Sequence, residues 1–275
     1  MNKYYHIFPA FIKQLFIIVF FSGLIYSQQQ IDIPWPSLAN SPWPILRGDM
    51  QGTGRSKYVG PRNADYILIK DMPLGIEFGP VIGYDNNLFT GTAALNTGPF
   101  NFFYSLDNKL DTIWKFQTES SWPNNSGPTL GADSTVYFGS ISGSIFALDY
   151  SRNVKWKKEA FGFGGYPFIS IAKSGNLYLS DRNRLLILDK HGNTIKDSTI
   201  SDFFAKEFMF SVGGDTIYFI NFDENDNYSL RATDLNLNVY WDKYLHDTNF
   251  GIPLIDNSNK IYIFTRDSLS NHYLS

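Results

Sequence analysis

Three stretches of this sequence decide its fold: LDNKLDTIW at residues 106–114, LDYSRNVKW at 148–156 and TDLNLNVYW at 233–241. In each stretch six residues separate an aspartate from a tryptophan, and the pairs are Asp107 with Trp114, Asp149 with Trp156, and Asp234 with Trp241. A fourth copy keeps this spacing from Asp189 but ends on Lys196. Successive aspartates lie 42, 40 and 45 residues apart. Such a regular interval indicates an internal repeat.

A second marker recurs with the same period. Each copy is preceded by an apolar, strand-like stretch with an aromatic residue, and these aromatics are Phe89, Tyr137, Tyr178, Tyr218 and Tyr262. After residue 30 no stretch shows a long helical period, and Asp202–Phe210 is the one candidate for a short helical linker. A period near 42 that contains only strand-like segments predicts an all-β fold, a β-propeller with four-stranded antiparallel blades.

The second repeat can be assigned strand by strand. Its strands are predicted, from the inside outward, at Pro128–Gly131, Thr135–Gly139, Ser144–Leu148 and Val154–Lys157. Since a single blade cannot bury either of its faces, the neighbouring blades must cover them. We expect each repeat tryptophan to lie across the gap between two blades, where its large ring adds to the packing. The alternative is that the tryptophans form an aromatic platform for a carbohydrate.

The composition excludes several classes of protein. The 275 residues contain no cysteine, which excludes disulfide scaffolds, thiolate metal sites and a cysteine-linked lipid anchor. The 26 acidic and 23 basic residues give a net charge of −3 without a basic run, so nucleic acid is not an expected partner. An aromatic content of 17%, with 22 glycines and 13 prolines, favours many short strands and tight turns.

The first 27 residues are predicted to be a signal peptide. Lys3 and Lys13 give a positively charged start, Leu15–Phe21 form an apolar centre, and cleavage is expected after Ser27. The alternative is an uncleaved anchor helix. Cleavage would make the protein secreted or periplasmic, within the cell envelope, and would leave no membrane span. Residues 28–64 then form an extended N-terminal segment.

Residues 65–275 are predicted to hold the propeller repeats. The blades are expected near residues 79–116, 127–158, 166–197, 208–243 and 251–275, and the last of these is partial. About four and a half blades predict a truncated, incomplete ring. The alternative is a compact five-bladed ring in which Tyr66–Lys70 completes the last blade.

Two phrases resemble the quinoprotein-like propellers, the pyrroloquinoline-quinone repeat family. The first is WPILRGDMQGTGRS at residues 43–56, which is similar to the opening phrase of that family. The second runs from Tyr137 to Trp156 and is similar to the strand–Gly–strand–Ala-Leu-Asp–turn–Trp pattern of its blades. The resemblance covers residues 43–275. It implies that a closed ring needs seven or eight blades and that Tyr66–Lys70 supplies the strand that closes it. Where the family has glycine before the tryptophan, this chain has Asn153, Asn193 and Asn238, which we expect to supply the left-handed backbone of the turn.

The resemblance implies the fold rather than the activity of that family. Enzymes of the family use a calcium-bound quinone and an acidic base, and no residue of this sequence matches those ligands or that base. We therefore place the chain in a non-enzymatic branch, which includes a propeller lipoprotein that assists outer-membrane-protein assembly. No catalytic, cofactor-binding or metal-binding residue is predicted, and the seven aspartates and tryptophans of the repeat are structural positions.

Other candidate chemistry is sparse. Asp223, Asn225 and Asn227 place oxygen ligands at alternate positions and give a weak indication of calcium. Arg47 and Asp49 are predicted to form a pair that holds the opening segment. The sequence predicts a binding or scaffold propeller that engages a protein or a glycan and catalyses no reaction. The alternative is a quinone-dependent oxidoreductase of the same fold.

Overall fold

The computed structural model describes residues 33–60, 62–63, 68–72, 75–76, 78–92, 102–118, 127–162, 168–181, 184–199, 208–222, 227–245, 252–266 and 272–274. Residues 33–275 form one compact unit, and the predicted signal peptide lies outside the described residues. All regular elements among the described residues are strands, so the chain has an all-β fold. Helices that are long and apolar enough to cross a membrane are absent from this part of the chain.

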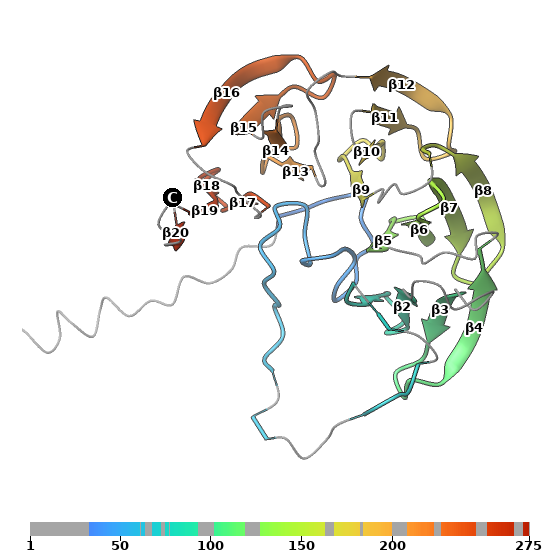
Figure 1. The fold of residues 1–275 in the computed structure, drawn as a ribbon. Coiled ribbons are helices and arrows are strands. Elements are labelled where there is room, and N and C mark those ends of the chain that lie inside the picture. The colour runs from blue at the N-terminus through green and yellow to red at the C-terminus, as the bar shows by residue number, and fades with distance from the viewer. Residues whose placement is uncertain are drawn as a thin grey trace, which may run out of the picture. The chain divides into compact units, whose positions relative to one another are not determined.

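Four of the blades are complete antiparallel sheets of four strands each (Figure 1). The first consists of β1 (Val81–Ile82), β2 (Leu88–Gly91), β3 (Phe102–Leu106) and β4 (Thr112–Gln117). The second consists of β5 (Thr129–Leu130), β6 (Thr135–Gly139), β7 (Ser144–Asp149) and β8 (Val154–Glu159). The third consists of β9 (Phe168–Ile171), β10 (Leu177–Asp181), β11 (Arg184–Leu188) and β12 (Thr194–Thr199). The fourth consists of β13 (Met209–Phe210), β14 (Ile217–Phe222), β15 (Tyr228–Thr233) and β16 (Val239–Leu245).

The fifth blade is shorter. It consists of β17 (Leu254–Ile255), β18 (Ile261–Tyr262), β19 (Phe264–Arg266) and β20 (His272–Leu274), which pair as β17 with β18 and β19 with β20. Only Ile263 separates β18 from β19. These two strands therefore form the second strand of the blade, with an interruption at Ile263, and this strand belongs to both pairs. The number of blades, four complete and one short, is consistent with an incomplete propeller.

The expected closing strand at Tyr66–Lys70 is not formed by its described residues. Leu68, Ile69 and Lys70 lie in no strand, and Tyr66 lies outside the described residues. Ile69 is 84% exposed, whereas a strand that completes a blade would bury its apolar side chains. The pairing partners of β18 and β19 are β17 and β20. This prediction was therefore wrong for residues 68–70.

The core lies between successive blades, as the repeat requires. One cluster joins the first blade to the second, where the rings of Phe103 and Phe138 stack with centroids 3.9 Å apart. A larger cluster joins the second, third and fourth blades and includes Tyr137, Leu179 and Phe219. Burial on both faces of middle strands such as β6 and β7 explains why these strands are apolar without alternation.

Each complete blade has a β-bulge at the same place on its outermost strand. In the second blade Ala147 pairs with Trp156 and Leu148 with Val154, so Lys155 is left out of the ladder. The other blades leave out the equivalent residues, which are Ile113, Ile195 and Tyr240. A bulge adds one residue to one strand and changes which side chains face the neighbour. In the first three blades the following residue, which is Trp114, Trp156 or Lys196, reaches the next blade.

Candidate binding surfaces

The repeat aspartates fold the turns between the third and fourth strands. Asp149 Oδ1 accepts hydrogen bonds from the backbone N–H groups of Ser151 (2.9 Å) and Asn153 (2.8 Å). The Asn153 amide also donates to Asp149 Oδ2 at 2.8 Å. The same backbone contacts are made by Asp107, Asp189 and Asp234. The aspartates at these predicted repeat positions thus lie in turns and accept hydrogen bonds from the backbone of their own hairpins.

The asparagines of these turns do not have the left-handed backbone that we expected of them. The positive φ angle belongs to the residue before each of them: 77° at Arg152, 83° at Gly192 and 68° at Leu237. The asparagine side chain is instead a donor to the aspartate carboxylate. The carboxylate therefore fixes both the turn and the asparagine, and in two of the turns it does so although Arg152 and Leu237 disfavour a positive φ.

These hydrogen bonds lower the pKa of the Asp149 and Asp189 carboxyl groups. The Asn193 side chain and two backbone N–H groups hold the pKa of Asp189 below its ordinary value of 3.8. At Asp149 partial burial acts to raise the pKa, but the Asn153 contacts outweigh it and the net shift is downward. An ionised acceptor forms stronger bonds with amide donors than a neutral one does. The aspartates serve the turn, which agrees with a structural role.

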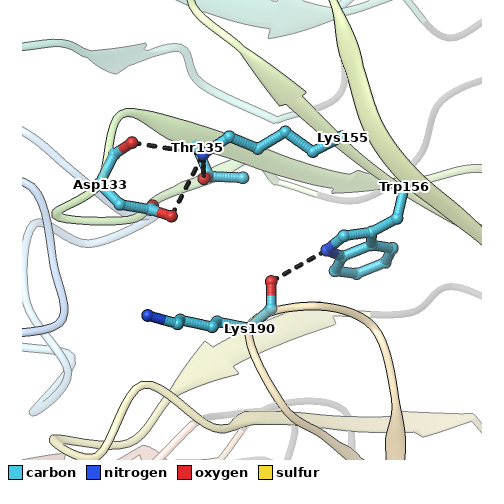
Figure 2. Close-up of polar contacts among 5 residues, drawn as sticks. All are labelled: Asp133, Thr135, Lys155, Trp156 and Lys190. Atoms are coloured by element: carbon cyan, nitrogen blue, oxygen red, sulfur yellow. Dashed lines mark hydrogen bonds and ion pairs between the residues drawn. The ribbon is translucent and has the colours of Figure 1, made fainter.

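Two of the repeat tryptophans bind the turn of the next blade. The Trp114 indole N–H donates to the Tyr150 carbonyl at 2.8 Å, and the Trp156 indole N–H donates to the Lys190 carbonyl at 2.9 Å (Figure 2). Both rings are partly buried. The Trp156 ring also lies against Tyr137 of its own blade, with centroids 5.8 Å apart. The two sequence markers, the strand aromatic and the repeat tryptophan, are therefore in contact.

The bulge residue of the second blade has a polar role beside this tryptophan. Lys155 Nζ lies 3.2 Å from Asp133 Oδ2 and also bonds the Thr135 hydroxyl, as Figure 2 shows. Burial acts to raise the pKa of Asp133, yet the bonds from Thr135 and Lys155 hold that pKa below its usual value. Lys155 thus ties the outermost strand of its blade to the turn before β6.

The third blade lacks the tryptophan but still bonds the fourth. Lys196 Nζ donates to the Asn236 carbonyl at 2.5 Å, and the Tyr178 hydroxyl donates to the neighbouring Leu235 carbonyl at 2.8 Å. Burial, with a smaller effect of the Asp234 charge, raises the pKa of Tyr178 to about 12, so the hydroxyl keeps its proton. Sequence reasoning missed this compensation, because the same tyrosine recurs as Tyr137 and Tyr218 in repeats that keep their tryptophan.

The third tryptophan differs from the other two. Trp241 lies on β16, against Tyr218 of its own blade, and is 42% exposed. Tyr240 and Tyr244 of the same strand are 60% and 53% exposed. We call Tyr240, Trp241 and Tyr244 the β16 strip. It lies on a strand that is outermost in its sheet and pairs only with β15 among the described strands.

A second surface is formed by the inner strands and is covered by the chain itself. Residues 35–53, which we call the inner segment, run beside all five inner strands (Figure 1). The backbone amides of Ile82, Leu130, Phe210 and Ile255 donate to the carbonyls of Trp43, Pro44, Met50 and Gln51, respectively, at 2.8–3.0 Å. The Trp35 indole N–H supplies the contact to β9, donating to the Ile171 carbonyl at 2.8 Å.

Asp49 shapes the loop of the inner segment. Its Oδ1 accepts from the backbone N–H groups of Gln51 (3.1 Å) and Thr53 (3.0 Å), and the Thr53 hydroxyl donates to Oδ2. Arg47, its expected partner, has a positive φ of 67°, and its carbonyl accepts from Gly54 N–H at 2.8 Å. The opening phrase of the family resemblance therefore forms a compact loop. Pattern reasoning gave no indication of which strands it contacts.

The weak calcium prediction falls mostly outside the described residues. Asp223 and Asn225 are not described, and the Asn227 side-chain oxygen accepts from the Tyr244 hydroxyl at 3.3 Å. Within the described ranges no group of three or more histidine, cysteine, aspartate or glutamate side chains could hold a metal ion.

Comparisons with known proteins identify the fold only. No family model matches this sequence. No curated protein matches it either. A catalytically inactive virginiamycin B lyase from Staphylococcus aureus with quinupristin is 14% identical over 71% of this chain and 68% of its own, with a TM-score of 0.51.

Two further solved structures have a TM-score of 0.47. The Pan2 WD40 domain of Neurospora crassa is 16% identical, over 70% of this chain and 57% of its own. BamB from Moraxella catarrhalis is 20% identical, over 71% of this chain and 59% of its own. This chain thus spans less than two thirds of either of these two. Together with its sheets, the likeness to the lyase defines this protein as a β-propeller.

Proposed function

We propose that this chain is a secreted or periplasmic binding propeller of the quinoprotein-like type, which engages a protein partner and catalyses no reaction of its own. The observation that carries the proposal is the β16 strip. Tyrosine and tryptophan are enriched where proteins bind one another, because each combines a large apolar ring with a polar group. Their exposure on one outermost strand is a feature that packing within the blade does not require.

The strand that bears the strip favours a protein over a glycan. β16 is the outermost strand of its described sheet, and a strand in that position is where a strand from another chain can add to the sheet. Six of its seven residues are exposed. At the inner strands, by contrast, the amides of Ile82, Leu130, Phe210 and Ile255 already donate to the inner segment. While the inner segment is in place, the outer surface is therefore the surface that a partner can reach.

The test is a pull-down from cell-envelope extract with the immobilised mature chain and a matched pair of variants. Tyr240→Ser alters the strip at the bulge position of the fourth blade. Ile195→Ser alters the equivalent bulge position of the third, where the side chain is 54% exposed. We expect Tyr240→Ser to lose the captured partner and Ile195→Ser to retain it, with both proteins equally stable to heat.

Two treatments distinguish the kinds of partner. Capture that is abolished by protease digestion of the extract supports a protein, whereas capture that survives protease and is abolished by periodate would identify a glycan. The same preparation is assayed for quinone- and calcium-dependent dye reduction. Turnover in that assay would overturn the non-catalytic part of the proposal and favour an oxidoreductase.

A further inference from the structure

The inner segment contacts the blades in the way that a bound peptide contacts a protein. Its bonds to the five inner strands are mostly backbone to backbone, and short antiparallel bridges pair Leu38 with Gly131, Trp43 with Ile82 and Ile45 with Thr129. These short pairings resemble strand addition, in which a second chain satisfies backbone groups of existing strands, and they alternate with turns and bends at residues 36–37 and 46–51. The segment belongs to none of the five sheets that it touches.

Side-chain anchors lie at both ends of the segment. At the start, the Trp35 ring lies edge-on to Phe210 with centroids 5.5 Å apart, and Lys173 Nζ is 5.1 Å from its centre. Near the end, Gln51 is 1% exposed, and its side-chain amide donates to the Phe210 carbonyl at 3.2 Å. Met50, beside it, is also 1% exposed. Buried anchors separated by backbone pairing give a bound peptide its register.

The connection that follows the segment is long, and its first residues are exposed. Residues 55–60 are all exposed and lie in no strand, and β1 begins only at Val81. The inner segment is therefore tethered to the blades rather than continuous with one of them. Covalent connection raises its local concentration but makes none of the contacts.

We propose that the inner strands form a binding site for a looped polypeptide segment, which the chain fills with its own residues 35–53. The ligand class follows from the contacts: a peptide that turns between a tryptophan at its start and, about fifteen residues later, a glutamine whose amide reaches the β13 carbonyl. The site is separate from the β16 strip, and the proposal does not depend on the function proposed above. The same site accepts this sequence in trans once the tethered copy is released.

The test uses the full chain with a specific protease site inserted between Lys57 and Tyr58, both of which are exposed. After cleavage the N-terminal piece is no longer covalently linked to the blades, and we expect it to remain bound and to co-elute with them on gel filtration. A fluorescent synthetic peptide of residues 33–54 is then added, and its binding is followed by anisotropy. We expect saturable binding that unlabelled peptide competes away.

Peptide variants test the anchors. Trp35→Ala and Gln51→Ala are each expected to weaken binding at least fivefold, because each removes a hydrogen bond and a packed side chain. Asn40→Ala is the matched control, since Asn40 is exposed and should leave affinity unchanged. Equal affinity of all three variants, or no saturable binding while the blades remain folded, overturns the proposal.

A measurement on the uncut chain covers the case in which cleavage unfolds the protein. The amides of Phe210 and Ile255 donate to Met50 and Gln51 of the segment. If the segment opens and closes as a ligand does, Gln51→Ala should accelerate hydrogen exchange at both amides several-fold relative to Asn40→Ala. Unchanged exchange at these two amides would show that the segment is a fixed part of the blades.

Discussion

Replacing Trp156 by alanine tests whether the repeat tryptophans hold neighbouring blades together. Truncation of a fully buried tryptophan costs about 3–5 kcal/mol, and Trp156 is only partly buried, so its packing contributes about 2 kcal/mol. The bond from its indole N–H to the Lys190 carbonyl adds about 1 kcal/mol. We therefore expect Trp156→Ala to lower the free energy of unfolding by about 3 kcal/mol in urea denaturation.

Two variants separate the ring from the hydrogen bond. Trp156→Phe keeps most of the packing and removes the donor, so a loss of about 1 kcal/mol is expected. Trp241→Ala removes the same side chain from the fourth blade, where it is 42% exposed and where no hydrogen bond of the indole is recorded among the described residues. There the expected loss is also about 1 kcal/mol. If Trp156→Ala and Trp241→Ala lower the free energy of unfolding by the same amount, contact with the turn of the next blade does not explain how these tryptophans stabilise the protein.

Three further outcomes follow from the turns. Tyr178→Phe should cost about 1 kcal/mol in urea denaturation, because the Leu235 carbonyl loses its donor, and an unchanged midpoint would contradict the compensation in the third blade. Arg152→Gly should stabilise the protein by about 0.5–1 kcal/mol, because glycine adopts the positive φ of 77° without strain, and a loss of stability would show that the side chain outweighs the backbone. Hydrogen bonds, first that from Ser258, lower the pKa of Asp256 from 3.8 to about 2, so its contribution to stability is present above about pH 4 and lost as the pH falls toward 2. The stability difference between the wild type and Asp256→Asn should vanish over that interval, and a difference that persists at pH 2 would contradict the assignment.

The blades could be predicted from the sequence because their determinants are local. The predicted strand Thr135–Gly139 has the bounds of β6, since the apolar stretch and the turn residues on either side of it lie within one repeat. The turn aspartates were identifiable for the same reason. The bulge was not, because its effect depends on the pairing of Ala147 with Trp156 rather than on either residue alone.

The contacts of the inner segment could not be predicted from any local pattern. Nothing in the spacing of WPILRGDMQGTG indicates that Gln51 bonds both β13 and β17. Lys196 illustrates a different limit: it departs from the repeat, and its long side chain nonetheless reaches the Asn236 carbonyl of the next blade. A mismatch in a repeat therefore does not indicate a missing contact when the substituted side chain can still donate a hydrogen bond.

The course of the inner segment sets the order in which this protein can fold. Each complete blade is a succession of hairpins between adjacent stretches of chain, and contacts of that kind form quickly. The Gln51 carbonyl, however, accepts a hydrogen bond from the amide of Ile255, about two hundred residues further along, so this contact must wait for the fifth blade. The segment is synthesised before these blades, and its docking is complete only after the fifth blade has formed. During that interval the inner strands keep unpaired backbone groups, and the newly made chain is at its most prone to associate with other chains.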